Sequence, residues 1–135
     1  KAKPLFYAKD VSSNLNFVSV HFYPKTGEVD KALTALRAYE IGKPLIIEEM
    51  FPLACSADEL MAFIDGSSDI VAGWISFYWG KTIDEYASDA DDLPAAITKT
   101  WLERFREKAM EINRGGDKDD PTRNVSGDRA TAPLN

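Results

Sequence analysis

Short apolar runs alternate with segments of helical spacing along the chain. Residues 17–23 (FVSVHFY) are rich in β-branched and aromatic side chains and stop at Pro24, which predicts a strand. Residues 45–47 form a short continuous apolar run, typical of a strand in a parallel sheet that is covered on both faces. Residues 70–79 (IVAGWISFYW) predict a third strand, which ends at Gly80.

Each predicted strand is followed by a predicted helix. The first helix begins at Glu28 and ends before Gly42, which sits where a C-terminal cap belongs. The second begins with a capping box at residues 56–59 (SADE), in which the serine and the glutamate satisfy free backbone donors reciprocally, and it ends at Gly66. The third follows Pro94. Its apolar stripe consists of Ile97, Trp101, Phe105, Ala109 and Ile112.

This order predicts an α/β fold in which parallel strands are joined by crossover helices. His21, Glu49 and Trp79 stand near the ends of the three predicted strands, at intervals of 28 and 30 residues. A (β/α)₈ barrel of ~250 residues averages ~31 residues per unit, and doubly wound sheets have similar periods. Residues 113–135 contain no aromatic residue and few large aliphatic ones, so we expect a polar, disordered C-terminal tail there.

Composition narrows the classes of function. The chain has 135 residues and a net charge of −6 with no basic cluster, which argues against nucleic-acid binding. No apolar run is long enough for a transmembrane helix, and no signal-peptide pattern opens the sequence; a start at Lys1 without Met suggests absent upstream residues. The single cysteine, Cys55, excludes an internal disulfide, and the single histidine excludes a two-histidine zinc site. We therefore expect no metal, no cofactor and no membrane partner.

Polar or aromatic residues recur at the carboxyl ends of the three predicted strands, the end at which parallel α/β folds bind ligands. Strand alternation places His21 and Tyr23 on one face. It likewise places Ile47 and Glu49 on one face of the second strand, and Phe77 and Trp79 on one face of the third. If these faces point to a common axis, a carboxylate, an imidazole, a phenol and an indole converge.

The residue types alone leave alternatives open. A carboxylate directly after a buried strand is costly unless it is hydrogen-bonded or hydrated, so Glu49 is the most informative residue. The alternative is that Glu48 and Glu49 both point into a solvated loop. His21 is either a core histidine with satisfied hydrogen bonds or a site residue, and Tyr23 is either a site residue or rim packing. The aromatic residues of the third strand, Trp74 among them, are also compatible with a core.

Three segments together carry a family resemblance. Residues 19–24 (SVHFYP), 43–53 (KPLIIEEMFPL) and 73–80 (GWISFYWG) resemble the sixth, seventh and eighth strands of a clan A glycoside hydrolase. The closest likeness is to the family 5 cellulases and mannanases, and it covers roughly residues 16–112. The resemblance implies that residues 1–112 hold the C-terminal three β/α units of a (β/α)₈ TIM barrel, which is incomplete on its own.

The resemblance also implies a retaining mechanism and a role for each candidate residue. Glu49 corresponds to the nucleophile that forms a covalent glycosyl-enzyme, while a second carboxyl group ~5–5.5 Å away protonates the leaving oxygen and then activates water. Tyr23 is expected to donate a hydrogen bond to Glu49. His21 is expected to bind either the nucleophile region or a sugar hydroxyl. Trp79 is the best match to the tryptophan that stacks on the sugar, with Phe77 and Trp74 as other possibilities.

The sequence departs from the family pattern at two points. Phe51 occupies a position that is often glycine in the family, and no Asn-Glu dipeptide supplies the acid/base. We therefore expect the C-terminal part of a retaining β-glycoside hydrolase of the endo-mannanase or endoglucanase type, inactive as an isolated chain. Its partners are an oligo- or polysaccharide and the N-terminal part of the barrel, in the same protein or a companion chain. The family favours a secreted or periplasmic location; the alternatives are a non-catalytic carbohydrate-binding barrel and a half-barrel structural module.

Overall fold

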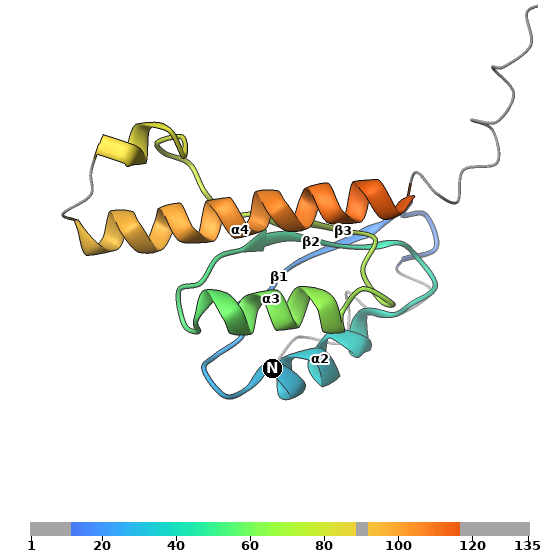
Figure 1. Ribbon diagram of the computed structural model, residues 1–135. Helices are drawn as coiled ribbons and strands as arrows, with labels where there is room; N and C mark the ends of the chain where they lie inside the picture. Colours follow the sequence, from blue (N-terminus) through green and yellow to red (C-terminus); the bar gives the residue numbers. More distant parts are fainter. Residues whose placement is uncertain (1–11, 89–91, 117–135) are drawn as a thin grey trace, which may run out of the picture.

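The computed structural model describes residues 12–88 and 92–116, and these residues form an α/β unit (Figure 1). The predicted alternation of strands and helices is confirmed, and so is the α/β class. The elements, in chain order, are β1 (Val18–His21), α2 (Val29–Leu36), η2 (Arg37–Tyr39), β2 (Leu45–Met50), α3 (Ala57–Gly66), β3 (Gly73–Ser76), η3 (Glu85–Ser88) and α4 (Leu93–Gly116).

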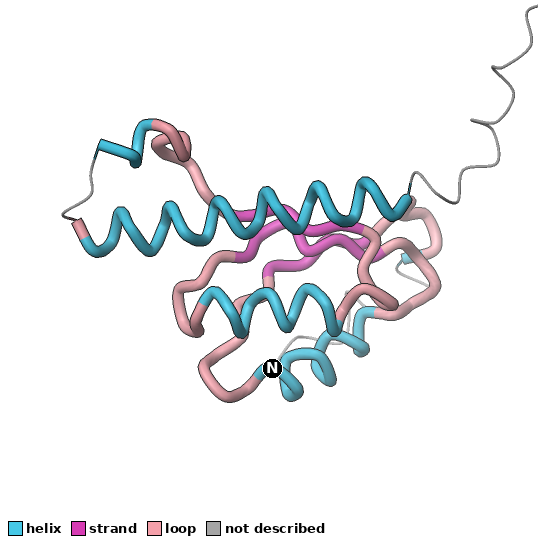
Figure 2. Tube along the Cα trace, viewed as in Figure 1, coloured by secondary structure: helices cyan, strands magenta, loops and turns pink. Residues whose placement is uncertain are grey.

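The three strands form one parallel sheet in the order β1-β2-β3. Because this order runs in one direction and parallel crossovers are right-handed, successive connections lie on the same face of the sheet. The helices accordingly follow one another across the strands, with α2 against α3 and α3 against α4 (Figures 1 and 2). A doubly wound sheet reverses its strand order at a switch point, and the described strands contain no such reversal.

The hydrophobic core lies between the helices and one face of this sheet. The sheet contributes alternate residues of two strands, Val18 and Val20 from β1 and Leu45 and Ile47 from β2. Trp101 of α4 is fully buried, and its indole Nε1 donates a 2.9 Å hydrogen bond to Ser76 Oγ of β3. The helices complete the core with Ala32, Leu36, Leu60, Phe63, Ile64 and Trp101.

The N-terminus of α3 carries the predicted capping box. Ser56 Oγ accepts a 3.2 Å hydrogen bond from the Glu59 backbone N–H, and Glu59 Oε2 accepts a 3.0 Å bond from the Ser56 backbone N–H. Glu59 Oε1 also accepts a 2.6 Å bond from the N–H of Gly27, in the loop after β1. Hydrogen bonds from these donors lower the pKa of Glu59, so one ionised carboxylate both caps α3 and fastens a neighbouring loop.

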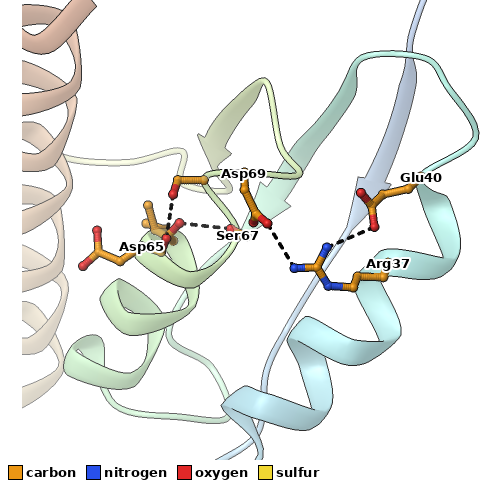
Figure 3. Close-up of polar contacts among 7 residues, drawn as sticks. Arg37, Glu40, Asp65, Ser67 and Asp69 are labelled. Carbon is orange, nitrogen blue, oxygen red and sulfur yellow. Dashed lines mark hydrogen bonds and ion pairs between the residues drawn. The ribbon is translucent and has the colours of Figure 1, made fainter.

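Polar contacts connect the loops at the amino-terminal end of the sheet, where the strands begin (Figure 3). Arg37, just after α2, lies 3.3 Å from Glu40 and 3.1 Å from Asp69, in the loop that leads to β3. In the same loop, buried Ser67 accepts a 3.1 Å hydrogen bond from the indole Nε1 of Trp74. These contacts join α2, α3 and β3 away from the carboxyl ends of the strands.

Three expectations about the elements need correction. β3 (Gly73–Ser76) is shorter than the predicted strand, so Phe77 and Trp79 follow it in a loop. Helix α4 continues to Gly116, and so includes the first residues assigned to a tail, while the rest of that tail, 117–135, lies outside the described residues. Only the middle of the α4 stripe is buried, because Ile97 and Ile112 remain 51% and 45% exposed. Within residues 12–88 and 92–116, no helix is long and apolar enough to cross a membrane.

Candidate functional site

The carboxyl ends of β1 and β2 bring four polar side chains together. His21 ends β1, and its Cα partner on β2 is Glu49. Beyond His21, the backbone N–H of Phe22 donates a 3.0 Å hydrogen bond to the Glu49 carbonyl, which keeps the chain beside β2 up to Tyr23. Glu48 precedes Glu49 on β2. Three of these residues, His21, Tyr23 and Glu49, were predicted to converge, and the structure confirms that they do.

An irregularity in β2 determines how the two glutamates face this site. The pairing register shifts between Val20 and His21 on β1, and between Ile47 and Met50 on β2. Ile47 and Met50 are both fully buried in the core, although strict alternation would place residues three positions apart on opposite faces. The expectation that Ile47 and Glu49 share a face is therefore wrong. The register shift returns Met50 to the core and leaves both glutamates directed to His21.

The carboxylate of Glu49 has a partner on each oxygen. The phenol of Tyr23 donates a 2.5 Å hydrogen bond to Oε1, as predicted, and His21 Nδ1 lies 2.9 Å from Oε2. The Glu49 side chain is 21% exposed, so it is largely shielded yet reachable from solvent. These contacts exclude the alternative in which Glu49 points freely into a solvated loop. They hold the carboxylate in one orientation and leave further lone pairs on both oxygens.

Tyr23 is a persistent hydrogen-bond donor in this arrangement. Burial, the hydrogen bond to Glu49 and the negative charge of Glu49 together raise the pKa of Tyr23 to about 12. The phenol therefore keeps its proton throughout the physiological range. Its interpretation as simple rim packing does not account for the direct contact with the carboxylate.

Glu48 is a member of the site that the sequence-based prediction left out. Its Oε1 lies 3.2 Å from His21 Nε2, so the imidazole stands between two successive carboxylates. The side chain of Glu48 is 45% exposed and that of His21 is 55% exposed, which excludes the core-histidine alternative. The signal in the sequence was the Glu-Glu pair directly after a buried strand, since a register shift can turn both residues to one neighbour.

The three candidate aromatic residues lie in different places. Trp74 packs against the core and its indole Nε1 donates to Ser67, so it lies on the helix side of β3, on the face opposite His21. The N–H of Phe77 donates a 2.8 Å hydrogen bond to the Met50 carbonyl, and its side chain is 59% exposed. Since Ser76 faces Trp101 and the core, alternation directs Phe77 to the face that carries His21.

Trp79 is fully exposed and lines a hollow of about 630 Å³ next to α4. The same hollow is lined by Leu102, Phe105 and Arg106 of that helix. The structure therefore places the indole of Trp79 beside α4, and gives no contact between it and Glu49. Stacking of Trp79 on a sugar stays a prediction.

The described part of the chain holds no cluster of three or more His, Cys, Asp or Glu side chains arranged to bind a metal ion. Comparisons of the sequence with protein-family models and with curated proteins, and of the structure with solved structures, found no match. Function is therefore inferred from the chemistry of the site itself.

Proposed function

We propose that this chain is the C-terminal part of a retaining β-glycoside hydrolase and that Glu49 is its nucleophile. One observation carries the proposal: a single carboxylate is held by Tyr23 and His21 at the carboxyl end of a parallel sheet. A nucleophilic carboxylate must be oriented and reachable, and the hydrogen bond from Tyr23 together with the 2.9 Å contact with His21 Nδ1 supplies the orientation. The carboxyl ends of parallel strands are also where (β/α)₈ enzymes place their catalytic residues.

The proposed reaction has two steps. An oxygen of Glu49 bonds to the anomeric carbon while the bond to the leaving oxygen breaks, and a second carboxyl group gives its proton to that oxygen. Water then bonds to the anomeric carbon and returns the electron pair to Glu49, while the second carboxylate takes the proton of the water. We assign this acid/base to the N-terminal part of the barrel, which the same protein or a companion chain supplies.

The shape of the sheet supports a barrel. Its helices lie on one face and its strand order does not reverse, as in a closed ring of β/α units. On the other face, Ile75 and Phe77 are 54% and 59% exposed, and Phe17 beside β1 is 52% exposed. Further strands would cover this apolar surface and pair the outer edges of β1 and β3. We therefore propose that β1, β2 and β3 are strands six, seven and eight of a TIM barrel.

The proposed substrate is an oligo- or polysaccharide with β-linked mannose or glucose units, and the family resemblance favours a secreted or periplasmic enzyme. Alternation after Ser76 directs the exposed Phe77 to the face that carries Glu49, where it would offer an apolar surface for the C–H side of a pyranose ring. Trp79 is the stacking residue that the resemblance implies. Stacking of Trp79 on the same sugar would require a loop conformation that brings its indole to this face.

A mechanism-based label tests the nucleophile directly. The complete protein that contains this chain is treated with 2-deoxy-2-fluoro-β-mannoside and β-glucoside reagents carrying good leaving groups, and its peptides are mapped by mass spectrometry. We expect a covalent glycosyl adduct on Glu49. The Glu49→Gln variant should take up no label and lose activity by roughly a thousandfold or more.

Glu28→Gln is the matched control, because it makes the same chemical change at a carboxylate that pairs with Lys31 on α2. It should label and turn over normally. An adduct on another residue, or near-normal hydrolysis by Glu49→Gln, would refute the assignment. Polysaccharide binding without label or hydrolysis in the unaltered protein would support a non-catalytic carbohydrate-binding barrel instead.

A further inference from the structure

The imidazole of His21 connects two carboxylates that are adjacent in the sequence. Its Nδ1 lies 2.9 Å from Glu49 Oε2, and its Nε2 lies 3.2 Å from Glu48 Oε1. Both separations are within or at the edge of hydrogen-bond distance. Within the described residues, Glu48 and Glu49 are the charged side chains that contact the imidazole ring. Tyr23 is connected to the ring through its hydrogen bond to Glu49.

The contact of the ring with Glu48 is a hydrogen bond and its contact with Glu49 is an ion pair, and the number of protons on the ring follows from these two contacts. A neutral imidazole has one N–H, and its other nitrogen is an acceptor. That acceptor would meet the lone pairs of a carboxylate oxygen, which also only accepts. An imidazolium ring has two N–H groups and donates to both carboxylates. Beside two ionised carboxylates, both contacts are attractive at once only when each ring nitrogen carries a proton.

We propose that Glu48 is a positioning residue that holds His21 as an imidazolium against Glu49. Glu48 supplies the second acceptor. Without Glu48, a neutral ring with one N–H directed to Glu49 would satisfy the remaining contact, and a second ring proton would have no acceptor among these residues. Glu48 also fixes the ring plane, because a contact on each nitrogen determines the rotation of the side chain. This role is a contribution to catalysis only if Glu49 is the nucleophile, so that part of the inference rests on the proposed function.

The imidazolium has a specific use when the glycosyl-enzyme breaks down. Water bonds to the anomeric carbon, the bond from that carbon to the Glu49 oxygen breaks, and the electron pair returns to Glu49. The proton of the water passes to the second carboxylate, the acid/base of the proposed reaction. Negative charge thus develops on Glu49 beside His21, and a positive ring stabilises that charge more than a neutral one. We expect loss of Glu48 to slow this second step most.

Nuclear magnetic resonance of the histidine ring nitrogens tests the protonation state without any measurement of activity. In the complete protein, the signals of His21 are identified by their loss in His21→Gln. We expect two ring N–H groups at neutral pH in the unaltered protein and in Glu48→Asp, but one in Glu48→Gln. A neutral ring in the unaltered protein, or an unchanged ring in Glu48→Gln, would overturn the proposal.

Kinetics with aryl glycosides that have good leaving groups test the catalytic part, because breakdown of the glycosyl-enzyme then limits turnover. In Glu48→Gln we expect kcat to fall about tenfold and KM to fall with it, as the intermediate accumulates. Glu48→Asp should recover most of kcat. Glu40→Gln, which alters another exposed ion pair, at Arg37, should change neither constant. An unchanged kcat in Glu48→Gln would contradict the role.

The two failures are distinguishable. If the fluoro-glycosides do not label Glu49, the proposed hydrolase is wrong, while the ring-nitrogen signals still decide whether Glu48 keeps His21 doubly protonated. If the label is found and the ring is neutral, the hydrolase stands and the role of Glu48 is refuted.

Discussion

At the scale of single residues, Tyr23 links the stability of the fold to the proposed nucleophile. Its pKa is raised from 10.0 to about 12, so the folded state favours the protonated phenol. The resulting stabilisation is complete below pH 10 and is lost as the pH rises through about 12. We therefore predict that the difference in free energy of unfolding between the unaltered protein and Tyr23→Phe is constant below pH 10 and shrinks above it. Denaturant unfolding measured across this range checks the prediction, and a difference that grows with pH would contradict it.

The site residues differ in how far the sequence could predict them. His21, Tyr23 and Glu49 were predictable because each stands at the carboxyl end of an apolar strand, and the parallel order brings these ends together, although strict alternation does not hold at Glu49. The Glu-Glu pair marked Glu48 as a candidate, but its contact with His21 depends on a register shift that only the pairing of two strands reveals. The core position of Trp74 stayed one of two alternatives for a similar reason: the sequence pattern does not say which face of a short strand meets the helices.

At the scale of elements, the cap of α3 is the contact that the sequence predicted most directly. Ser56 and Glu59 exchange hydrogen bonds at the first turn, and the motif is local, so no tertiary information is needed to recognise it. We predict that Ser56→Ala lowers the free energy of unfolding by about 1 kcal/mol, since a backbone N–H loses its side-chain acceptor.

Thr34→Ala is the matched control for this measurement. Thr34 Oγ1 donates to the Asp30 carbonyl within α2 and is exposed, so its removal should change the free energy by less than about 0.5 kcal/mol. Chemical denaturation of the three proteins gives the comparison. Equal losses for the two substitutions would show that the cap contributes nothing specific.

Element boundaries were less predictable than element types. The apolar run at 70–79 continues beyond β3, which ends at Ser76. An aromatic residue after Ser76 packs outside the strand, since Tyr78 stacks on Phe51 with ring centroids 6.0 Å apart. Helix α4 extends past the expected boundary because helical spacing of polar residues leaves no signal in the apolar pattern. Local motifs therefore identified the elements, whereas tertiary contacts determined where the strands end.

At the scale of the whole molecule, the two faces of the sheet differ in how far other parts of the described chain bury them. The face toward the helices holds the core, while the opposite face presents Ile75, Phe77 and the site. A sheet in water usually buries at least one face, and parallel sheets commonly bury both. In the proposed barrel, further strands would cover these exposed apolar side chains and would supply the acid/base that the proposed reaction uses.

Hydrogen exchange at the outer edge of β1 tests this arrangement. Successive backbone N–H groups point to opposite edges of a strand, and the Val18 N–H donates to Pro44 on the β2 side. The Val20 N–H therefore also faces β2, whereas the Ser19 N–H faces the outer edge. If a neighbouring barrel strand pairs with β1 in the complete protein, the Ser19 amide should exchange about as slowly as that of Val20. Rapid exchange at Ser19 beside slow exchange at Val20 would show that β1 is an edge strand and that the sheet is not closed on this side.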